Sequence, residues 1–250
     1  MKSYDFYFKS GFYDKRYPRP NSTISDRIIS CVKNGKDAIL DYGCGNGRYL
    51  IPLSRLENVS SLIGFDISQA ALAILDKRLN KTTGKKCRDI YLTTDFNDVI
   101  SRVNREKKIN LALILFGVYS CILDKNERMR ILREIIDVMD PENNRLILSV
   151  PNRYRRFWLS QLKSKGSSFG YQRKYHGQTL RFEYKLFTKK EIENELKEAG
   201  FTVLNVERQS VLSECQVTSS PLFARIDKAL CATLPVTMAY DYLVEATYTP

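Results

Sequence analysis

The sequence predicts an α/β fold, in which helices cover both faces of one mostly parallel, seven-stranded, doubly wound sheet of the Rossmann-like type. Short apolar segments alternate with segments of helical periodicity along most of the chain. A glycine-rich turn at residues 43–47 directly follows the first apolar segment. The run Leu111–Phe116 is apolar throughout, which is typical of a central strand buried on both faces.

The apolar segments are the expected strands of this sheet. They are residues 38–41, 62–65, 90–93, 111–116, 146–150, 201–206 and 242–247. In an open α/β sheet, ligands bind beyond the carboxyl ends of the strands. The residues that follow the first four strands are therefore expected to border one crevice.

Cap signals place the ends of several helices. Ser68 is suited to cap a helix whose apolar residues, at 71, 72, 75 and 79, share one face. Asp124 opens a second helix, which begins shortly after the fourth strand. Thr188 and Glu191 have the spacing of a capping box, and Gly200 marks the end of that helix.

The chain is expected to divide into a short N-terminal part and one larger domain. Residues 1–36 are rich in aromatic side chains and predict a helical cap. Residues 37–250 carry the alternating pattern of the main domain. Two stretches, about 153–187 and 209–236, interrupt the alternation and are expected to be insertions, with the first forming a lid.

Composition excludes several classes of protein. With 250 residues and 43% hydrophobic side chains, the chain can bury a substantial core. It has no apolar run of about eighteen residues and begins with a polar segment, so we expect no membrane span, no signal peptide and a cytoplasmic location. Six cysteines without a CxxC pair, and a single histidine, predict neither a metal site nor a disulfide framework. The net charge of +12 permits attraction to polyanions without identifying a partner.

The motif that indicates chemistry is DYGCGNG, which runs from Asp41 to Gly47. It lies between a strand and a helix, the context in which a glycine-rich turn binds a ligand. Its spacing is G-x-G-x-G, whereas a dinucleotide fingerprint requires G-x-G-x-x-G, and position 48 is Arg. An acidic residue before the first glycine is poorly placed beside a diphosphate. Asp41 instead suits a ligand that carries an ammonium group.

This motif resembles the first motif of the class I S-adenosylmethionine-dependent methyltransferases, and the resemblance extends over about residues 37–150. It implies that residues 37–250 form a methyltransferase domain with S-adenosyl-L-methionine as cofactor. The implied cofactor-binding residues are Asp41, Gly43, Cys44, Gly45, Gly47, Asp66, Ile67, Asp95, Phe96 and Phe116. By the same resemblance, Asp66 accepts hydrogen bonds from the ribose hydroxyls, and Asp95 and Phe96 meet the adenine.

Residues on the acceptor side are less clearly marked. The resemblance places the segment from Phe116 to Tyr119 beside the transferred methyl group, which makes Tyr119 a candidate catalytic residue. His176 is the second candidate, because imidazole titrates near neutral pH and suits proton removal from a hydroxyl or amine; a surface histidine is the alternative. The predicted substrate-side residues are Tyr13, Arg16, Trp158 and Tyr175.

Three functions remain open at this point. The favoured one is methyl transfer to an O or N nucleophile of a small metabolite or a lipid-like precursor. The second is methylation of tRNA or another RNA, since residues 153–190 contain eleven Lys or Arg and one acid, Glu183, among many aromatic residues. The third is a cofactor-binding protein without turnover. The sequence indicates no oligomeric state.

Two short runs bear on the RNA alternative. RYPRP, at residues 16–20, and GCGNGRYL, at residues 43–50, resemble the methyltransferases that modify the wobble uridine of tRNA. That group usually carries paired histidines where this chain has Val118–Cys121. The basic, aromatic segment is equally suited to be a lid, with its aromatic side chains facing the active site and its charges in water.

Overall fold

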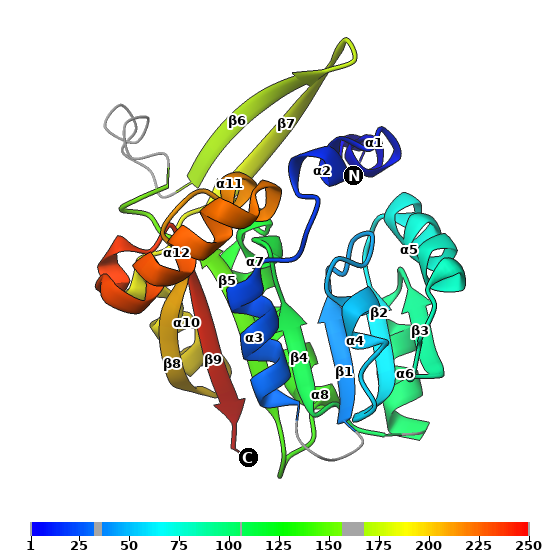
Figure 1. Cartoon of the computed structure of the whole chain (residues 1–250). Coiled ribbons are helices and arrows are strands. Elements are labelled where there is room, and N and C mark those ends of the chain that lie inside the picture. Colours follow the sequence, from blue (N-terminus) through cyan, green and yellow to red (C-terminus); the bar gives the residue numbers. More distant parts are fainter. Residues whose placement is uncertain (1, 33–36, 106, 157–167, 250) are drawn as a thin grey trace.

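The computed structural model describes residues 2–32, 37–105, 107–156 and 168–249, in which a seven-stranded sheet is covered by helices on both faces (Figure 1). The strand order is β3-β2-β1-β4-β5-β9-β8. The strands are β1 (Asp37–Tyr42), β2 (Val59–Phe65), β3 (Asp89–Thr93), β4 (Leu111–Ile114), β5 (Arg145–Pro151), β8 (Phe201–Ser210) and β9 (Asp241–Tyr248). The first five are parallel, and β9 is antiparallel to both β5 and β8. The predicted fold class is confirmed.

Two hydrophobic cores lie on opposite faces of the sheet. One contains side chains of α6 (Phe96–Arg105), α8 (Lys125–Val138) and α10 (Lys189–Ala199). The other contains side chains of α3 (Ser22–Cys31), α4 (Leu50–Leu53) and α5 (Gln69–Lys81). Strand residues contribute alternately to the two cores: Leu40 belongs to the first and Ile39 to the second.

The predicted helix caps are confirmed. The Ser68 side chain accepts a hydrogen bond from the backbone N–H of Ala71, and Asp124 caps α8 in the same way. Thr188 and Glu191 form a reciprocal capping box at the start of α10, and Gly200 ends that helix in the left-handed conformation. These signals act within one turn of the chain, so the sequence contains all the partners they need.

The turn after β4 differs from the sequence prediction. The fourth strand was expected to reach Phe116, but it ends at Ile114. Phe116 has φ 61° and Gly117 has φ 78°, so the backbone turns sharply before α7 (Val118–Cys121). The backbone N–H of Phe116 donates to Ser149 Oγ at 2.6 Å, which anchors the turn to β5. A non-glycine residue in this region is strained, and such residues concentrate at functional sites.

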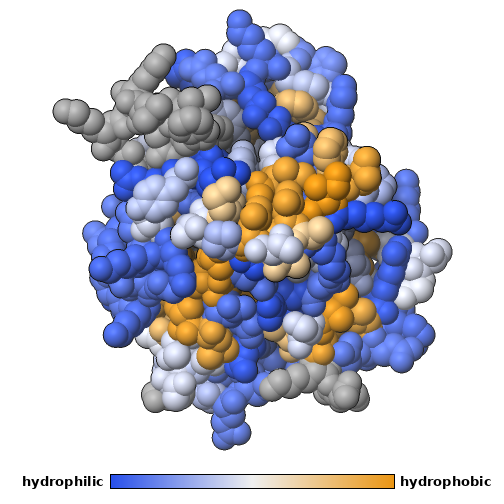
Figure 2. Space-filling view, turned by 60° about the vertical axis from the view of Figure 1, so that its left-hand side comes forward, coloured by the Kyte–Doolittle hydropathy of each residue, from blue (hydrophilic) through white to orange (hydrophobic). Residues whose placement is uncertain are grey.

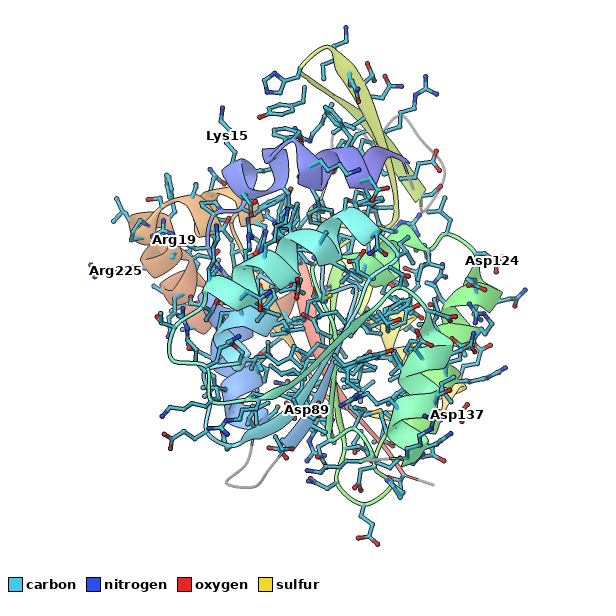
Figure 3. The ribbon with its side chains drawn as sticks, turned by 90° about the vertical axis from the view of Figure 1, so that its right-hand side faces the viewer. Lys15, Arg19, Asp89, Asp124, Asp137 and Arg225 are labelled. Atoms are coloured by element: carbon cyan, nitrogen blue, oxygen red, sulfur yellow. The ribbon has the colours of Figure 1, made fainter. Side chains whose placement is uncertain are left out.

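The first insertion contains an antiparallel hairpin, β6 (Ser168–Tyr175) and β7 (Gln178–Lys185), which rises above the sheet beside α1 (Lys2–Lys9) and α2 (Phe12–Arg16) (Figure 1). Aromatic side chains join these elements: Phe182 contacts Tyr4 and Tyr7, and Phe12 stacks on Tyr175 with ring centroids 4.1 Å apart. We call α1, α2 and this hairpin the roof. On its other side α1 packs on α5 (Figure 3).

The second insertion folds as α11 (Glu214–Ser219), α12 (Pro221–Thr233) and a short 3-10 turn (Val236–Met238). Buried Asp227 of α12 accepts hydrogen bonds from the backbone N–H groups of Val211 and Leu212, which holds the helix against the end of β8. The outer face of α12 is apolar: its exposed Leu222, Phe223 and Ile226 contribute to a hydrophobic patch in Figure 2. Among the described residues, no helix is both long and apolar enough to cross a bilayer.

Candidate functional site

A cavity of about 390 Å³ lies at the carboxyl ends of the central strands, beneath the roof. Residues from the ends of β1, β2, β4 and β5 form its floor, α1 and the hairpin contribute aromatic side chains, and the start of α11 closes one side. It is lined by Tyr4, Tyr7, Phe8, Tyr13, Tyr17, Gly43, Gly45, Asp66, Ile67, Phe116, Cys121, Glu127, Arg156, Tyr171, Tyr184, Gln209, Glu214 and Asp241, among others. The predicted crevice therefore exists, and several predicted site residues meet in it.

The glycine-rich loop borders the cavity with its backbone. The N–H groups of Gly43 and Cys44 both donate to the Phe65 carbonyl, which ties the loop to the end of β2. Gly45 has φ 55°, and a Cβ at this position would lie 3.1 Å from the Phe8 ring. Gly47, with φ 87°, lies outside the cavity lining, where a Cβ would overlap Leu75. Gly45 thus leaves room at the cavity, whereas Gly47 allows close packing of α5.

Asp66 lies at the cavity, directly after β2. Its carboxylate accepts hydrogen bonds from the backbone N–H groups of Gly45 and Ser68, both at 2.8 Å, one on each oxygen. Burial raises the pKa of Asp66, and these two hydrogen bonds oppose that shift. The neighbouring Ile67 is 57% exposed and also lines the cavity, so this wall offers a carboxylate beside an apolar surface.

Two other predicted cofactor residues are buried beside the cavity. Asp41, near the end of β1, has a pKa raised to about 7, first by burial and then by the nearby Asp66. Cys44 is also buried, and burial raises the pKa of its thiol. Neither lines the cavity as the structure describes it.

Asp95 and Phe96 are not brought to the cavity lining. Asp95 is exposed and accepts a hydrogen bond from the Asn97 backbone N–H. Phe96 packs edge-on against Tyr42 and Phe65, which do line the cavity. Phe96 therefore supports the wall from behind.

The roof is fastened directly to the cofactor side of the cavity. Asp14 of α2 accepts a hydrogen bond from the Asn46 side chain and forms an ion pair with Arg78 of α5 at 2.6 Å. Asp5 of α1 accepts a hydrogen bond from the Ser68 hydroxyl at 2.5 Å. The N-terminal segment is thus coupled to the glycine-rich loop and to the first turn of α5.

The side of the cavity away from Asp66 is aromatic with a few buried charges. Arg156 forms an ion pair with Asp241 at 2.9 Å and lies over the Tyr184 ring. The Tyr4 hydroxyl lies 3.0 Å from Cys121 Sγ. Burial raises the pKa of Cys121 to about 11, so this thiol is protonated near neutral pH.

Three buried polar residues at this side were not predicted as site residues. Arg48 lies over the rings of Tyr17 and Phe116, and its guanidinium is 3.9 Å from the Glu214 carboxylate. Gln209 donates to Glu214 at 3.1 Å. In the sequence, Arg48 stands out only because it replaces the third glycine of a dinucleotide-binding motif. Gln209 and Glu214 match no sequence motif: Gln209 lies near the end of β8, and Glu214 begins α11 in the second insertion.

The predicted acceptor-side residues are not gathered in one place. Tyr13 lines the cavity, and Arg16, whose Nε donates to the Tyr17 hydroxyl, lies next to it in the roof. Tyr175 stacks on Phe12, away from the cavity lining. Trp158 lies outside the described residues.

The two predicted catalytic residues lie away from the cavity lining. His176 is exposed at the tip of the hairpin with φ 44°, because the turn between β6 and β7 carries it outward. Tyr119 is fully buried, and its hydroxyl donates to Glu195 at 2.9 Å beside Arg128. In the part of the chain that the structure describes, no group of three or more His, Cys, Asp or Glu side chains is placed to hold a metal ion.

Comparisons with known proteins agree with this geometry. A family described as a methyltransferase domain matches residues 13–206. The chain is 33% identical over 100 residues to a release factor glutamine methyltransferase of Buchnera aphidicola; the match covers 40% of this chain and only 34% of that protein. The chain thus matches about a third of the length of that relative.

Two solved structures share the fold. An S-adenosylmethionine-dependent methyltransferase from Clostridium acetobutylicum superposes with a TM-score of 0.65 and 17% identity, over 96% of this chain and 98% of that one. A glycopeptide N-methyltransferase complexed with S-adenosylmethionine superposes with a TM-score of 0.58 and 14% identity, over 93% and 95%. At these identities the similarity shows a common fold.

Proposed function

Because this chain belongs to the methyltransferase-domain family and is a class I S-adenosylmethionine-dependent methyltransferase, we propose that its roofed cavity holds the cofactor together with a small-molecule acceptor. The methyl group is transferred to an O or N nucleophile of that acceptor. Membership of the family supports an enzyme over a cofactor-binding protein without turnover.

The cofactor side of the cavity fits S-adenosylmethionine. When bound, this cofactor supplies a methyl group that is already activated on a sulfonium. Each carboxylate oxygen of Asp66 accepts one hydrogen bond, from the backbone N–H of Gly45 or of Ser68, and keeps a second lone pair. The carboxylate can therefore also accept hydrogen bonds from the ribose hydroxyls of the cofactor. Ile67 offers an apolar surface for the adenine, and Gly45 leaves space where any side chain would intrude.

The observation that carries the proposal is that one cavity beneath the roof joins these residues to a group of aromatic side chains. Tyr4, Tyr171 and Tyr184 line the same space as Gly45 and Asp66. Methyl transfer is an in-line displacement, so alignment and exclusion of water supply most of what the protein must add. An acceptor small enough to lie under the roof meets both needs.

Proton removal by a dedicated base is not required in this proposal. The cavity lining includes neither His176 nor Tyr119. The Tyr119 hydroxyl is engaged with Glu195 in the core, and burial raises its pKa far above neutrality. The side chains of the cavity act by holding the nucleophile in line and keeping water out.

RNA is the less favoured acceptor because the aromatic residues of the first insertion are already engaged. Phe182 packs on Tyr4 and Tyr7, and Tyr175 stacks on Phe12, so these rings do not present free faces to bases. The lid reading of this segment is the one that the contacts favour.

The proposal is tested by following a labelled methyl group. The protein is incubated with methyl-labelled S-adenosylmethionine and cell extract, with and without ribonuclease, and the products are separated by size. We expect label in the small-molecule fraction, unaffected by ribonuclease. Label in RNA or in protein would contradict the proposed acceptor class, and failure of S-adenosylhomocysteine to bind in calorimetry would contradict the cofactor site.

A further inference from the structure

The cavity has a polar wall for which the proposed function gives no role. It consists of Arg48, from the loop before α4, Gln209, near the end of β8, and Glu214, at the start of α11. We call these three residues the polar end. All three are more than nine-tenths buried, and Gln209 and Glu214 line the cavity.

Hydrogen bonding at the polar end is incomplete. Glu214 Oε2 accepts from the Asn21 side chain at 2.9 Å and from Gln209 Nε2 at 3.1 Å. Within the part of the chain that the structure describes, Glu214 Oε1 and Gln209 Oε1 are buried without a hydrogen-bond partner, and so are Nε and Nη1 of Arg48. Because Gln209 donates its amide N–H to Glu214, the orientation of its amide is fixed and its oxygen remains an acceptor. Buried polar atoms without partners are rare in native proteins, and each needs an explanation.

Arg48 does not satisfy these two oxygens. Its Nη1 is 3.9 Å from Glu214 Oε1, which is too far for a hydrogen bond, and its Nη2 instead donates to the Tyr17 carbonyl at 3.4 Å. The guanidinium lies flat over aromatic rings, with its carbon 4.0 Å from the centre of Phe116. Its positive charge opposes the burial that raises the pKa of Glu214, which favours the ionised carboxylate.

The two oxygens without a partner, Glu214 Oε1 and Gln209 Oε1, determine how many hydrogen-bond donors a ligand must supply. A single hydroxyl supplies one proton and can satisfy only one of the two oxygens, whereas an amino group supplies two or three. A carboxylate or phosphate supplies none to the two oxygens that line the cavity, and Arg48, whose unpaired donors could bind an anion, is not among the lining residues. The rings of Tyr17, Phe116 and Tyr184 line the same cavity and suit a flat, aromatic body.

We propose that the methyl acceptor is an amine that carries an aromatic ring on a short side chain, and that the polar end binds its amino group through Glu214 Oε1 and Gln209 Oε1 while the tyrosine and phenylalanine rings hold its aromatic part. This inference rests on the proposed function, because it assigns the acceptor class of the same cavity. Glu214 and Gln209 are specificity residues in it. Arg48 lies beside Glu214, and its positive charge opposes the increase in the pKa of Glu214 that burial causes.

The test uses three probes of similar size with the wild-type protein saturated with S-adenosylhomocysteine. Tyramine carries an amino group, 4-ethylphenol lacks it, and 3-(4-hydroxyphenyl)propionate replaces it with a carboxylate. Calorimetry is expected to show tyramine binding at least about tenfold more tightly than the other two, since each tenfold corresponds to the loss of roughly one good hydrogen bond. Equal affinities, tighter binding of the carboxylate, or no tyramine binding at millimolar concentration would overturn the inference.

Variants assign the effect to the polar end. Glu214→Gln and Gln209→Met are expected to lose tyramine affinity about tenfold while S-adenosylhomocysteine affinity stays within about twofold. Glu198→Gln makes the same chemical change on the exposed face of α10, away from the cavity lining, and is the matched control, expected to leave both affinities unchanged. If both variants bind tyramine like the wild type, or if S-adenosylhomocysteine affinity falls with tyramine affinity, the polar end does not select the acceptor and the inference fails. Failure of the wild type to bind S-adenosylhomocysteine would instead refute the proposed function.

Discussion

At the scale of single residues, the carboxylates near the glycine-rich loop contribute both to the ligand cavity and to the stability of the fold. Asp66 faces the cavity, but its oxygens also accept two backbone N–H groups. Asp41 is buried close by, and its carboxyl and that of Asp66 disfavour each other's ionisation. Substitutions at these positions therefore affect binding and folding together, and the measurements must separate the two.

We expect Asp66→Ala to weaken S-adenosylhomocysteine binding by roughly 2 to 4 kcal/mol, because two charge-assisted hydrogen bonds to the ribose are lost. The melting temperature should also fall, since the N–H groups of Gly45 and Ser68 lose their acceptor. Asp66→Asn retains one acceptor oxygen and should show a smaller loss of stability. Calorimetry and thermal melts measure the two effects, and unchanged affinity in Asp66→Ala would refute the assignment.

The raised pKa of Asp41 predicts that the stability of the folded protein depends on pH. Its pKa of about 7 in the folded protein lies above its ordinary value, so the folded state holds a proton that the unfolded chain releases above about pH 4. Stability is therefore lost as the pH rises from about 4 to about 7, by on the order of 4 kcal/mol for this group. We expect Asp41→Asn to melt higher than the wild type at about pH 8 and at a similar temperature at about pH 4.5. Parallel pH profiles for the two proteins would contradict this account.

At the scale of elements, the roof is formed by parts of the chain that are far apart in sequence. α1 and α2 meet the hairpin mainly through aromatic rings, and Asp5 and Asp14 tie them to the cofactor side. An element held by a small aromatic cluster is expected to open at lower free energy than the central sheet.

We expect Tyr175→Ala to loosen this roof. It removes the ring stacked on Phe12, so amide hydrogen exchange over residues 2–17 should become faster while exchange in β1 and β4 stays unchanged. Methyl transfer should slow, because water enters the cavity more easily. Lys174→Ala, next to it on the hairpin and exposed, is the control and should leave exchange unchanged. If the two variants behave alike, the Phe12–Tyr175 stack does not hold the roof.

At the scale of the whole molecule, the net charge of +12 includes basic side chains that are engaged within the protein. Lys15, Arg19 and Arg225 project on the side of α2 and α12, whereas Asp124 and Asp137 lie on the opposite side, along α8 (Figure 3). Arg156 is one of the basic residues of the first insertion. It forms an ion pair with Asp241 at the cavity instead of facing solvent. The basic composition therefore overstates the surface available to a polyanion.

We expect tRNA to bind weakly, with a small dependence of log affinity on log salt concentration. Each phosphate contact would add roughly 0.7 to 0.9 to that slope. Replacing Arg173, Lys174 and Arg181 of the hairpin by Gln should leave methyl transfer to small molecules nearly unchanged. Filter binding over a range of salt concentrations measures the slope. A steep slope that these three substitutions flatten would favour RNA as the acceptor over a small molecule.

The sequence by itself determined the parts of this protein that depend on neighbours along the chain. The alternating pattern, the caps at Ser68 and Thr188, and the glycine-rich loop after β1 were all predictable, because their partners lie within a few residues. The position of Asp66 beside Gly45 followed as well, since parallel strands end at a common edge.

Only the tertiary structure decided which side chains face the cavity. Asn21 and Glu214 are separated by 193 positions and Arg156 and Asp241 by 85, yet each pair is in direct contact. Tyr119 lies in the sequence segment expected at the transferred methyl group, but it turns into the core to meet Glu195. Such contacts depend on how the two insertions and the N-terminal helices fold back over the sheet. Hydrophobic periodicity shows that a residue is buried, but it carries no information about which distant residue it meets.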